Sequence, residues 1–333
     1  MNPSEQVRLG RTQVSVTRLG LGTAPMGGLF READEREAVE GVERACALGL
    51  RYFDTAPLYG YGLAEQRLGR ALRGKPREGV TVSTKVGRLL RADASPESTQ
   101  YHDGQPFWRG TPPVNPVFDF SYDGVMRSLE ESLQRLRLDR VDILYIHDPD
   151  THHQAALEGA YRALDSLRRA GTVGAIGVGM NAWEPLARFA LEADFDCFME
   201  AGRYTLLDKG ALRELLPLCQ RRGISIVAAG IFNSGILADP RKKARFDYIP
   251  APPELVNRAL RLEAVCQRWG VPLKAAAVQF PFGHPAVATV VVGCRSAADI
   301  QEVETLCRLP IPHELWKELV SEGLLPEEGI PQR

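Results

Sequence analysis

The stretch RYFDTAPLYGYGLAEQRLG, from Arg51 to Gly69, begins with a short apolar run and passes through a glycine-containing loop into a helical pattern. Asp54 stands at the end of the apolar run, and Tyr59 follows five residues later inside the loop. An apolar strand, a loop and an amphipathic helix make up the repeating unit of α/β folds. The stretch therefore predicts one such unit, with a carboxylate and a phenol at the carboxyl end of its strand.

This unit recurs eight times along the chain. The predicted strands are apolar runs at Arg18–Thr23, Arg51–Thr55, Val80–Lys85, Val141–His147, Thr172–Val178, Phe195–Ala201, Gly223–Gly230 and Ala286–Gly293. The helical patterns after them are Glu37–Leu48, Ala64–Leu72, Val125–Leu136, Leu157–Leu167, Pro185–Glu192, Leu212–Gln220, Glu254–Trp269 with Leu273–Gln279, and Ala297–Leu306. Near-continuous apolar strands are typical of parallel sheets that helices cover. Eight units over about 300 residues predict a (β/α)8 TIM barrel, an α/β fold, rather than a doubly wound sheet.

We expect one barrel domain over residues 1–333, because no linker or low-complexity segment interrupts the repeat. Two stretches, Leu90–Phe118 and Ile231–Pro253, exceed the usual connections, and loops of that length are commonly functional. Trp108, in the first of them, is a candidate for the apolar wall of a substrate site. Packing of the loop against itself is the alternative.

Composition excludes several classes of function. Lys and Arg total 41 against 42 for Asp and Glu, so no basic excess favours nucleic acid or a membrane surface. The first residues contain no signal-peptide core, and no apolar run approaches the ~18 residues of a membrane span. Six cysteines form no Cys-x-x-Cys pair and have no histidine at a metal-ligand spacing. We therefore expect a cytoplasmic protein without a metal site.

Three successive predicted strands end in an ionisable residue: Asp54, Lys85 and His147. In a barrel these strand ends and Tyr59 meet at one rim, where catalytic residues lie. Polar strand ends that merely meet water are the alternative for each residue alone. A lysine beside a tyrosine lowers a phenol pKa that is ordinarily near ~10, so the set predicts proton transfer at an oxygen. Such a transfer at a carbonyl needs a partner event at carbon, for which hydride from a nicotinamide is the natural candidate.

The chain resembles the aldo-keto reductase family. FDTAPLYGYG, STKVG, ILYIHDPD and VVVGCRSAADI follow the order of that family's motifs, within Arg8–Leu309. The resemblance implies that Tyr59 is the general acid/base and that Lys85 tunes its pKa. It also implies that Asp54 pairs with Lys85 and that His147 orients the substrate oxygen.

Shorter phrases, PLYGYGLAE, TKVGRLL, HDPD, AGRYTLLD and GIFNSGIL, resemble the bacterial NAD-dependent sugar dehydrogenases of this family. These act on L-fucose or D-threo-aldoses, and pyridoxal 4-dehydrogenase is a close relative. We therefore expect an NAD(P)-dependent oxidoreductase, an aldose 1-dehydrogenase, acting on a small sugar or aldehyde as a monomer or small homo-oligomer. The alternatives are a pyridoxal 4-dehydrogenase, a general aldehyde reductase and, from another class, a non-catalytic nucleotide-sensing regulatory subunit.

The family binds its dinucleotide extended over the barrel mouth, which implies a set of cofactor residues. Gly22 and Thr23 would approach the ribose, Asn181 the carboxamide, and the IFNSGIL loop the pyrophosphate. The full implied set is Gly22, Thr23, Asp54, Asn181, Phe232, Ser234, Gly235, Leu237, Gly293, Arg295 and Asp299. The implied substrate contacts are Tyr59, Trp108 and His147.

The segment after the last strand bears on the choice between NAD and NADP. In NADP-preferring relatives a Lys-Ser pair and a later Arg hold the 2′-phosphate; here Gly293 and Cys294 replace the pair and Asp299 replaces the Arg. This predicts a preference for NAD. Arg295 argues the other way, because a charge-assisted hydrogen bond of about 1.5–3 kcal/mol would partly offset the repulsion.

A competing dinucleotide motif lies in mid-chain. Gly177, Gly179 and Ala182 satisfy G-x-G-x-x-A after a predicted strand, and Asp196 follows at the spacing of a Rossmann acidic residue. Its position inside an unbroken eightfold repeat favours the barrel interpretation.

Overall fold

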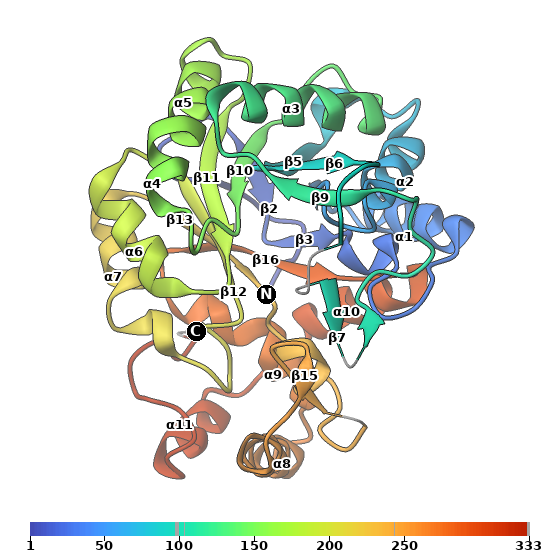
Figure 1. Cartoon of the computed structure of the whole chain (residues 1–333). Coiled ribbons are helices and arrows are strands. Elements are labelled where there is room, and N and C mark those ends of the chain that lie inside the picture. The colour runs from blue at the N-terminus through green and yellow to red at the C-terminus, as the bar shows by residue number, and fades with distance from the viewer. Residues whose placement is uncertain (97–99, 103, 243, 332–333) are drawn as a thin grey trace.

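The computed structural model describes residues 1–96, 100–102, 104–242 and 244–331. Eight parallel strands close into a barrel, each paired with its neighbour in chain order, so the predicted (β/α)8 barrel is confirmed (Figure 1). The barrel strands are β3 (Leu19–Gly22), β4 (Tyr52–Asp54), β5 (Thr81–Val86), β10 (Ile143–His147), β11 (Ala175–Met180), β12 (Cys197–Ala201), β13 (Ser225–Ala229) and β16 (Val287–Gly293).

Helices surround the barrel, and their apolar faces and the outer faces of the strands form the larger hydrophobic core. They are α1 (Glu35–Ala47), α2 (Leu63–Leu72), α3 (Tyr122–Leu136), α4 (His153–Ala155), which continues through a π-helical segment into α5 (Arg162–Arg169), α6 (Trp183–Glu192), α7 (Leu215–Arg222), α8 (Pro253–Arg268), α9 (Leu273–Gln279), α10 (Ala297–Arg308) and α11 (His313–Ser321). On α3 the predicted apolar face is the buried one, with Val125, Leu129 and Leu136 inside.

Several predicted boundaries are wrong by a few residues. Helix α1 begins at Glu35 rather than Glu37, because Asp34 caps it by accepting from the Glu37 amide at 2.9 Å. Strand β11 runs three residues later than predicted at its start and ends at Met180. Helix α11 was not predicted at all.

A short antiparallel hairpin lies before the first barrel strand and was also not predicted. Its strands are β1 (Gln6–Arg8) and β2 (Ser15–Thr17). Leu9 and Val16 from this hairpin belong to the inner core together with Tyr52 and Tyr145 from the barrel lumen. The hairpin therefore covers the amino-terminal end of the barrel, opposite the strand ends that carry Asp54 and His147.

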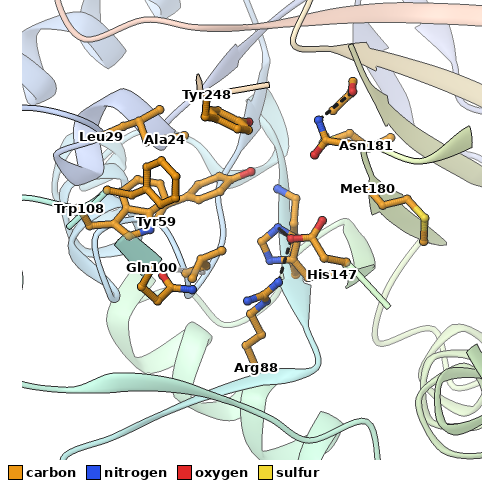
Figure 2. A pocket seen from close by; sticks show the side chains of 16 residues that line it. Ala24, Leu29, Tyr59, Arg88, Gln100, Trp108, His147, Met180, Asn181 and Tyr248 are labelled. Carbon is orange, nitrogen blue, oxygen red and sulfur yellow. Dashed lines mark hydrogen bonds and ion pairs between the residues drawn. The ribbon is translucent and has the colours of Figure 1, made fainter. Parts of the chain in front are cut away.

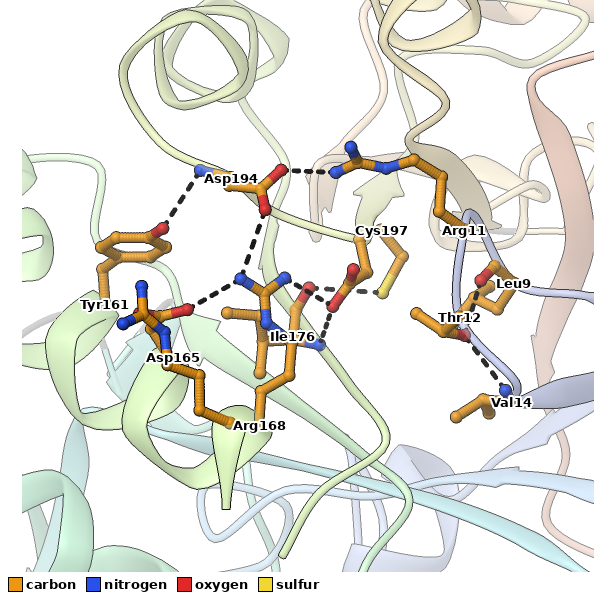
Figure 3. Close-up of polar contacts among 12 residues, drawn as sticks. Leu9, Arg11, Thr12, Val14, Tyr161, Asp165, Arg168, Ile176, Asp194 and Cys197 are labelled. Atoms are coloured by element: carbon orange, nitrogen blue, oxygen red, sulfur yellow. Dashed lines mark hydrogen bonds and ion pairs between the residues drawn. The ribbon is translucent and has the colours of Figure 1, made fainter. Parts of the chain in front are cut away.

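The Rossmann interpretation of Gly177–Ala182 is wrong. Gly177 and Gly179 lie inside β11, paired on both sides within the barrel. Asp196 precedes β12, at the amino-terminal end of the barrel, where it accepts from Arg168 at 3.1 Å and from the Ile176 amide at 2.9 Å. Figure 3 shows Arg168 paired with Asp165 and Asp194, and the same guanidinium pairs with Asp196. Asp196 thus ties a helix to two strands and does not face the mouth.

The two long connections contain short strands. The first holds the ribbon β6 (Arg88–Arg91) with β9 (Asn115–Phe118) and the hairpin β7 (Tyr101–His102) with β8 (Gln105–Pro106); residues 97–99 and 103 of the predicted loop lie outside the described residues. The second holds the hairpin β14 (Arg245–Phe246) with β15 (Ile249–Pro250).

Three aromatic rings join these loops at the barrel mouth. Phe30 follows β3, Phe107 comes from the first long loop and Tyr248 from the second. Their ring centres are 5.8 Å (Phe30–Phe107), 6.2 Å (Phe30–Tyr248) and 6.1 Å (Phe107–Tyr248) apart. We call these three residues the ring cluster; it connects segments that are far apart in the sequence.

Candidate active site

The four predicted catalytic side chains lie together at the mouth of the barrel. Lys85 donates to Asp54 Oδ2 at 2.7 Å and to the Thr55 carbonyl at 3.0 Å. The Lys85 ammonium is 4.7 Å from the centre of the Tyr59 ring, and the Tyr59 and His147 rings meet edge to face at 5.9 Å. Strands β4, β5 and β10 each deliver one of these groups, as parallel strands in one barrel must.

The glycines beside Tyr59 let its loop adopt a backbone conformation that is unfavourable for other residues. Gly60 and Gly62 have φ of 64° and 92°, in the left-handed region that favours glycine. A Cβ on Gly60 would also collide with the backbone of Gly27. The loop can therefore turn tightly against the segment after β3 and direct the phenol into the site.

Burial is the largest influence on the pKa of Tyr59. Burial, and after it the negative charge of Asp54, raise the pKa of Tyr59 well above its ordinary value. Lys85, which the sequence predicts to lower this pKa, is itself paired with Asp54. Its role in tuning Tyr59 stays a prediction.

His147 is held in its neutral form. Burial, followed by the positive charges of Arg88 and Lys85, lowers the pKa of His147 well below its ordinary value. Its Nε2 lies 3.5 Å from Asp148 Oδ2, and its buried Nδ1 has no hydrogen-bond partner among the described residues. A neutral imidazole can orient an oxygen by donating from one ring nitrogen without adding charge to the site.

A cavity of about 290 Å³ opens beside these groups (Figure 2). Trp108 and Tyr59 stand on one side with ring centres 5.7 Å apart, and His147 and Arg88 lie below them. Trp108 is only 7% exposed and lines the cavity, where the sequence placed a substrate wall. The remaining lining residues are Ala24, Leu29, Leu58, Lys85, Gln100, Phe107, Asp148, Met180, Asn181, Met199, Ala201 and Tyr248.

A second cavity of about 510 Å³ continues from the first across the mouth. Tyr59, Asn181 and Tyr248 line both, so the two form one continuous cleft. The predicted cofactor residues that line the second cavity are Gly22, Asp54, Asn181, Phe232, Ser234, Gly235, Gly293, Arg295 and Asp299. Gly235 has φ of 106° and open space where a side chain would stand, which leaves its backbone accessible to an anion.

Two predicted cofactor residues do not line the cleft. Thr23 is fully buried, and its hydroxyl donates to the Asp54 carbonyl at 3.0 Å. Leu237 is also fully buried and belongs to the outer core. Thr23 instead fixes the strand end that carries Asp54, and Leu237 anchors the loop from below.

Asp299 and Arg295 are both engaged within the protein. Asp299 Oδ2 accepts from the Arg295 amide at 2.9 Å and the Ser296 amide at 3.2 Å, forming the capping box of α10. The Arg295 guanidinium donates to the Leu29 carbonyl at 2.9 Å. Both residues also border the cleft, so their opposed effects on a 2′-phosphate stay a prediction.

Sequence reasoning missed three residues of the site: Arg88, Asp148 and Tyr248. Arg88 Nη2 donates to Asp148 Oδ2 at 2.9 Å, and both line the first cavity. Asp148 directly follows His147, so its place after a strand end was a usable signal. Tyr248 lies in the second long loop, and only the fold brings it over the mouth.

Within the described ranges, no group of three or more His, Cys, Asp or Glu side chains is arranged to hold a metal ion. No described helix combines the length and apolar character that crossing a membrane requires.

Comparisons with known proteins agree with this geometry. A sequence model of the Aldo/keto reductase family matches residues 18–322. The chain is 44% identical to pyridoxal 4-dehydrogenase of Microbacterium luteolum, with 98% of this chain and 99% of that protein covered. It is 42% identical to D-threo-aldose 1-dehydrogenase of a Pseudomonas species, with 94% and 96% covered. Its structure is similar to glycerol dehydrogenase of Gluconobacter oxydans, with a TM-score of 0.74, 21% identity and coverage of 99% and 98%, a likeness of fold alone.

Proposed function

Because this chain belongs to the aldo/keto reductase family and is an oxidoreductase of that type, we propose that it is an NAD-dependent aldose 1-dehydrogenase acting on L-fucose or a D-threo-aldose. The observation that carries the proposal is the position of Tyr59. It stands where the two cavities join, next to His147 and Lys85, so a molecule in the first cavity meets a proton donor at the edge of the second.

In this proposal Tyr59 is the general acid/base at the substrate oxygen. The nicotinamide supplies or accepts the hydride at carbon. Neutral His147 orients the same oxygen, and the Asp54–Lys85 pair fixes a positive charge beneath the Tyr59 ring. We assign the second cavity to the dinucleotide: Asn181 would contact the nicotinamide end, and Phe232, Ser234 and Gly235, which also line this cavity, would hold the pyrophosphate.

The charged pair Arg88–Asp148 favours a neutral, hydroxyl-rich substrate. Both residues line the first cavity, and the Asp148 side chain is 29% exposed, so the pair presents a carboxylate and a guanidinium there. Sugar hydroxyls can donate to the carboxylate and accept from the guanidinium. An anionic substrate would compete with Asp148 for Arg88 and meet its repulsion.

A pyridoxal 4-dehydrogenase activity is the second candidate. It is supported by the 44% identical relative and by the tilted Tyr59 and Trp108 rings, whose interplanar angle is 34°. A flat pyridine ring packs well against such aromatic faces.

For the cofactor we propose NAD over NADP, because the cleft near α10 presents the carboxylate Asp299 and engages Arg295 in contacts of its own. We also propose a cytoplasmic enzyme, monomeric or a small homo-oligomer, that binds neither nucleic acid nor membranes.

The test is the initial rate of nicotinamide reduction with L-fucose, D-threo-aldoses, other aldoses and pyridoxal, each with NAD⁺ and NADP⁺. We expect the highest kcat/KM with L-fucose or a D-threo-aldose and NAD⁺. A value for pyridoxal ten-fold above every aldose would transfer the assignment to the second candidate. The Asp148→Asn variant should lose aldose kcat/KM more than pyridoxal kcat/KM.

A further inference from the structure

A file of polar side chains runs through the lumen of the barrel below the site. Ser83 donates to Asp54 Oδ1 at 2.7 Å. The Ser83 hydroxyl lies 3.1 Å from the Tyr52 hydroxyl, which lies 3.3 Å from the Tyr145 hydroxyl. Cys197 Sγ stands 3.6 Å beyond Tyr145. Three hydroxyls thus connect the middle of the lumen to the carboxylate that pairs with Lys85.

The charge of Asp54 fixes the direction of every bond in this file. An ionised carboxylate only accepts, so the Ser83 proton points to Asp54. Ser83 must then accept from Tyr52, and Tyr52 must accept from Tyr145. All three O–H dipoles therefore point the same way, and hydrogen bonds aligned in this manner strengthen one another.

The alignment matters because Asp54 and Lys85 are both buried. Asp54 is 2% exposed and Lys85 is 1% exposed, so neither charge is solvated from outside. A buried ion pair is tolerated when further hydrogen bonds satisfy its remaining lone pairs. Asp54 Oδ2 is satisfied by Lys85, and Oδ1 by Ser83 alone among the side-chain donors of the described chain. Burial also raises the pKa of Tyr52 and of Tyr145, so both phenols keep the protons that they donate.

We propose that Ser83, Tyr52 and Tyr145 are positioning residues, whose aligned hydroxyls keep the Asp54 carboxylate in place and thereby hold Lys85 beside Tyr59. The proposal rests on the assigned role of Tyr59. None of the three residues lines the cavities or reaches a substrate.

The test is the graded series Ser83→Ala, Tyr52→Phe and Tyr145→Phe, each removing one hydroxyl. We expect turnover to fall about 10-fold for Ser83→Ala, because a hydrogen bond to a charged group contributes a factor of about ten or more to an equilibrium constant. Tyr52→Phe should lose less, and Tyr145→Phe least. Since none of the three residues lines the cavities, the loss should fall on kcat in the same order, with the dinucleotide Kd unchanged.

Tyr204→Phe is the matched control. Its hydroxyl is also removed from a buried tyrosine, but it donates to the Gly329 carbonyl outside the lumen. Tyr204→Phe should leave kcat unchanged. An ungraded series, or a control that lowers kcat as far as Tyr52→Phe does, would overturn the proposal.

Thermal melting separates this proposal from the proposed function. Ser83→Ala should lower Tm more in the parent than in an Asp54→Asn background, because the Asp54 carboxylate is the acceptor of the Ser83 hydroxyl. That difference is measurable even if no sugar or pyridoxal is turned over. An equal loss of Tm in both backgrounds contradicts the proposed role of Ser83, whereas an inactive parent protein contradicts the proposed function alone.

Discussion

The ammonium of Lys85 lies against the face of the Tyr59 ring, 4.7 Å from its centre. Within the described structure its hydrogen bonds go to Asp54 and Thr55, not to the Tyr59 hydroxyl. Lysine and tyrosine are thus coupled through the ring face, a contact of cation–π type that strengthens when water is excluded. This relationship makes separate predictions for the two residues.

Replacing Tyr59 by Phe keeps the ring and its contact with Lys85 but removes the proton. Turnover should fall at least ~10²-fold, the lower end for general acid–base catalysis. Dinucleotide binding, measured by fluorescence titration, should change little. Near-normal turnover would falsify the acid/base assignment.

Replacing Lys85 by Met leaves Asp54 as a buried charge without its partner. The variant should lose about 3–5 kcal/mol of unfolding free energy as well as activity. Turnover per folded molecule separates the two effects. The double variant Asp54→Asn with Lys85→Met should regain stability and remain slow; recovery of full turnover would assign the pair a structural role only.

The pH dependence should differ between the two reaction directions. Because the pKa of Tyr59 is raised, the phenol keeps its proton at neutral pH. Reduction, which uses the protonated form, should stay constant through neutrality, whereas oxidation should rise with pH. No loss of activity is expected near the ordinary pKa of histidine, because the pKa of His147 is lowered. Profiles of kcat/KM in both directions check this, and an oxidation rate that does not change with pH would argue against it.

Replacing Trp108 by Ala opens one wall of the first cavity. KM for the sugar should rise more than the dinucleotide Kd. Tyr101→Ala is the control, since Tyr101 belongs to the same long loop but is 42% exposed and does not line the cavity. An equal rise in the sugar KM and the dinucleotide Kd, or no rise in either, would contradict a substrate-wall role for Trp108.

Asp299→Arg should shift the preference from NAD⁺ toward NADP⁺ by replacing a negative charge beside the cleft with a positive one. It should also lower stability by about 0.5–2 kcal/mol, because the capping box of α10 is lost. Asp299→Asn removes the charge only, so its cofactor preference should lie between those of the parent and of Asp299→Arg. The ratio of kcat/KM values decides; a parent that prefers NADP⁺ ten-fold, or about 1.4 kcal/mol, contradicts the cofactor proposal.

The sequence predicted the barrel because its strands and helices carry strong periodic patterns. It also predicted the grouping of Asp54, Tyr59, Lys85 and His147, because strand ends of a closed parallel barrel share one rim. Features set by contacts distant in sequence were missed. The pairing of Arg295 with Leu29 and the placement of Tyr248 depend on loops whose paths no local pattern encodes. The raised pKa of Tyr59 likewise depends on its burial, which is a property of the folded site.

The hairpin of β1 and β2 closes the amino-terminal end of the barrel, so the barrel has one opening, at the end that carries Tyr59. Leu9 and Val16 close the far end, so whatever enters beside Tyr59 must leave by the same opening. The two cavities share that opening, and the ring cluster of Phe30, Phe107 and Tyr248 narrows it. A ligand in the first cavity and a ligand in the second must therefore use the same opening, which constrains the order in which they bind and leave.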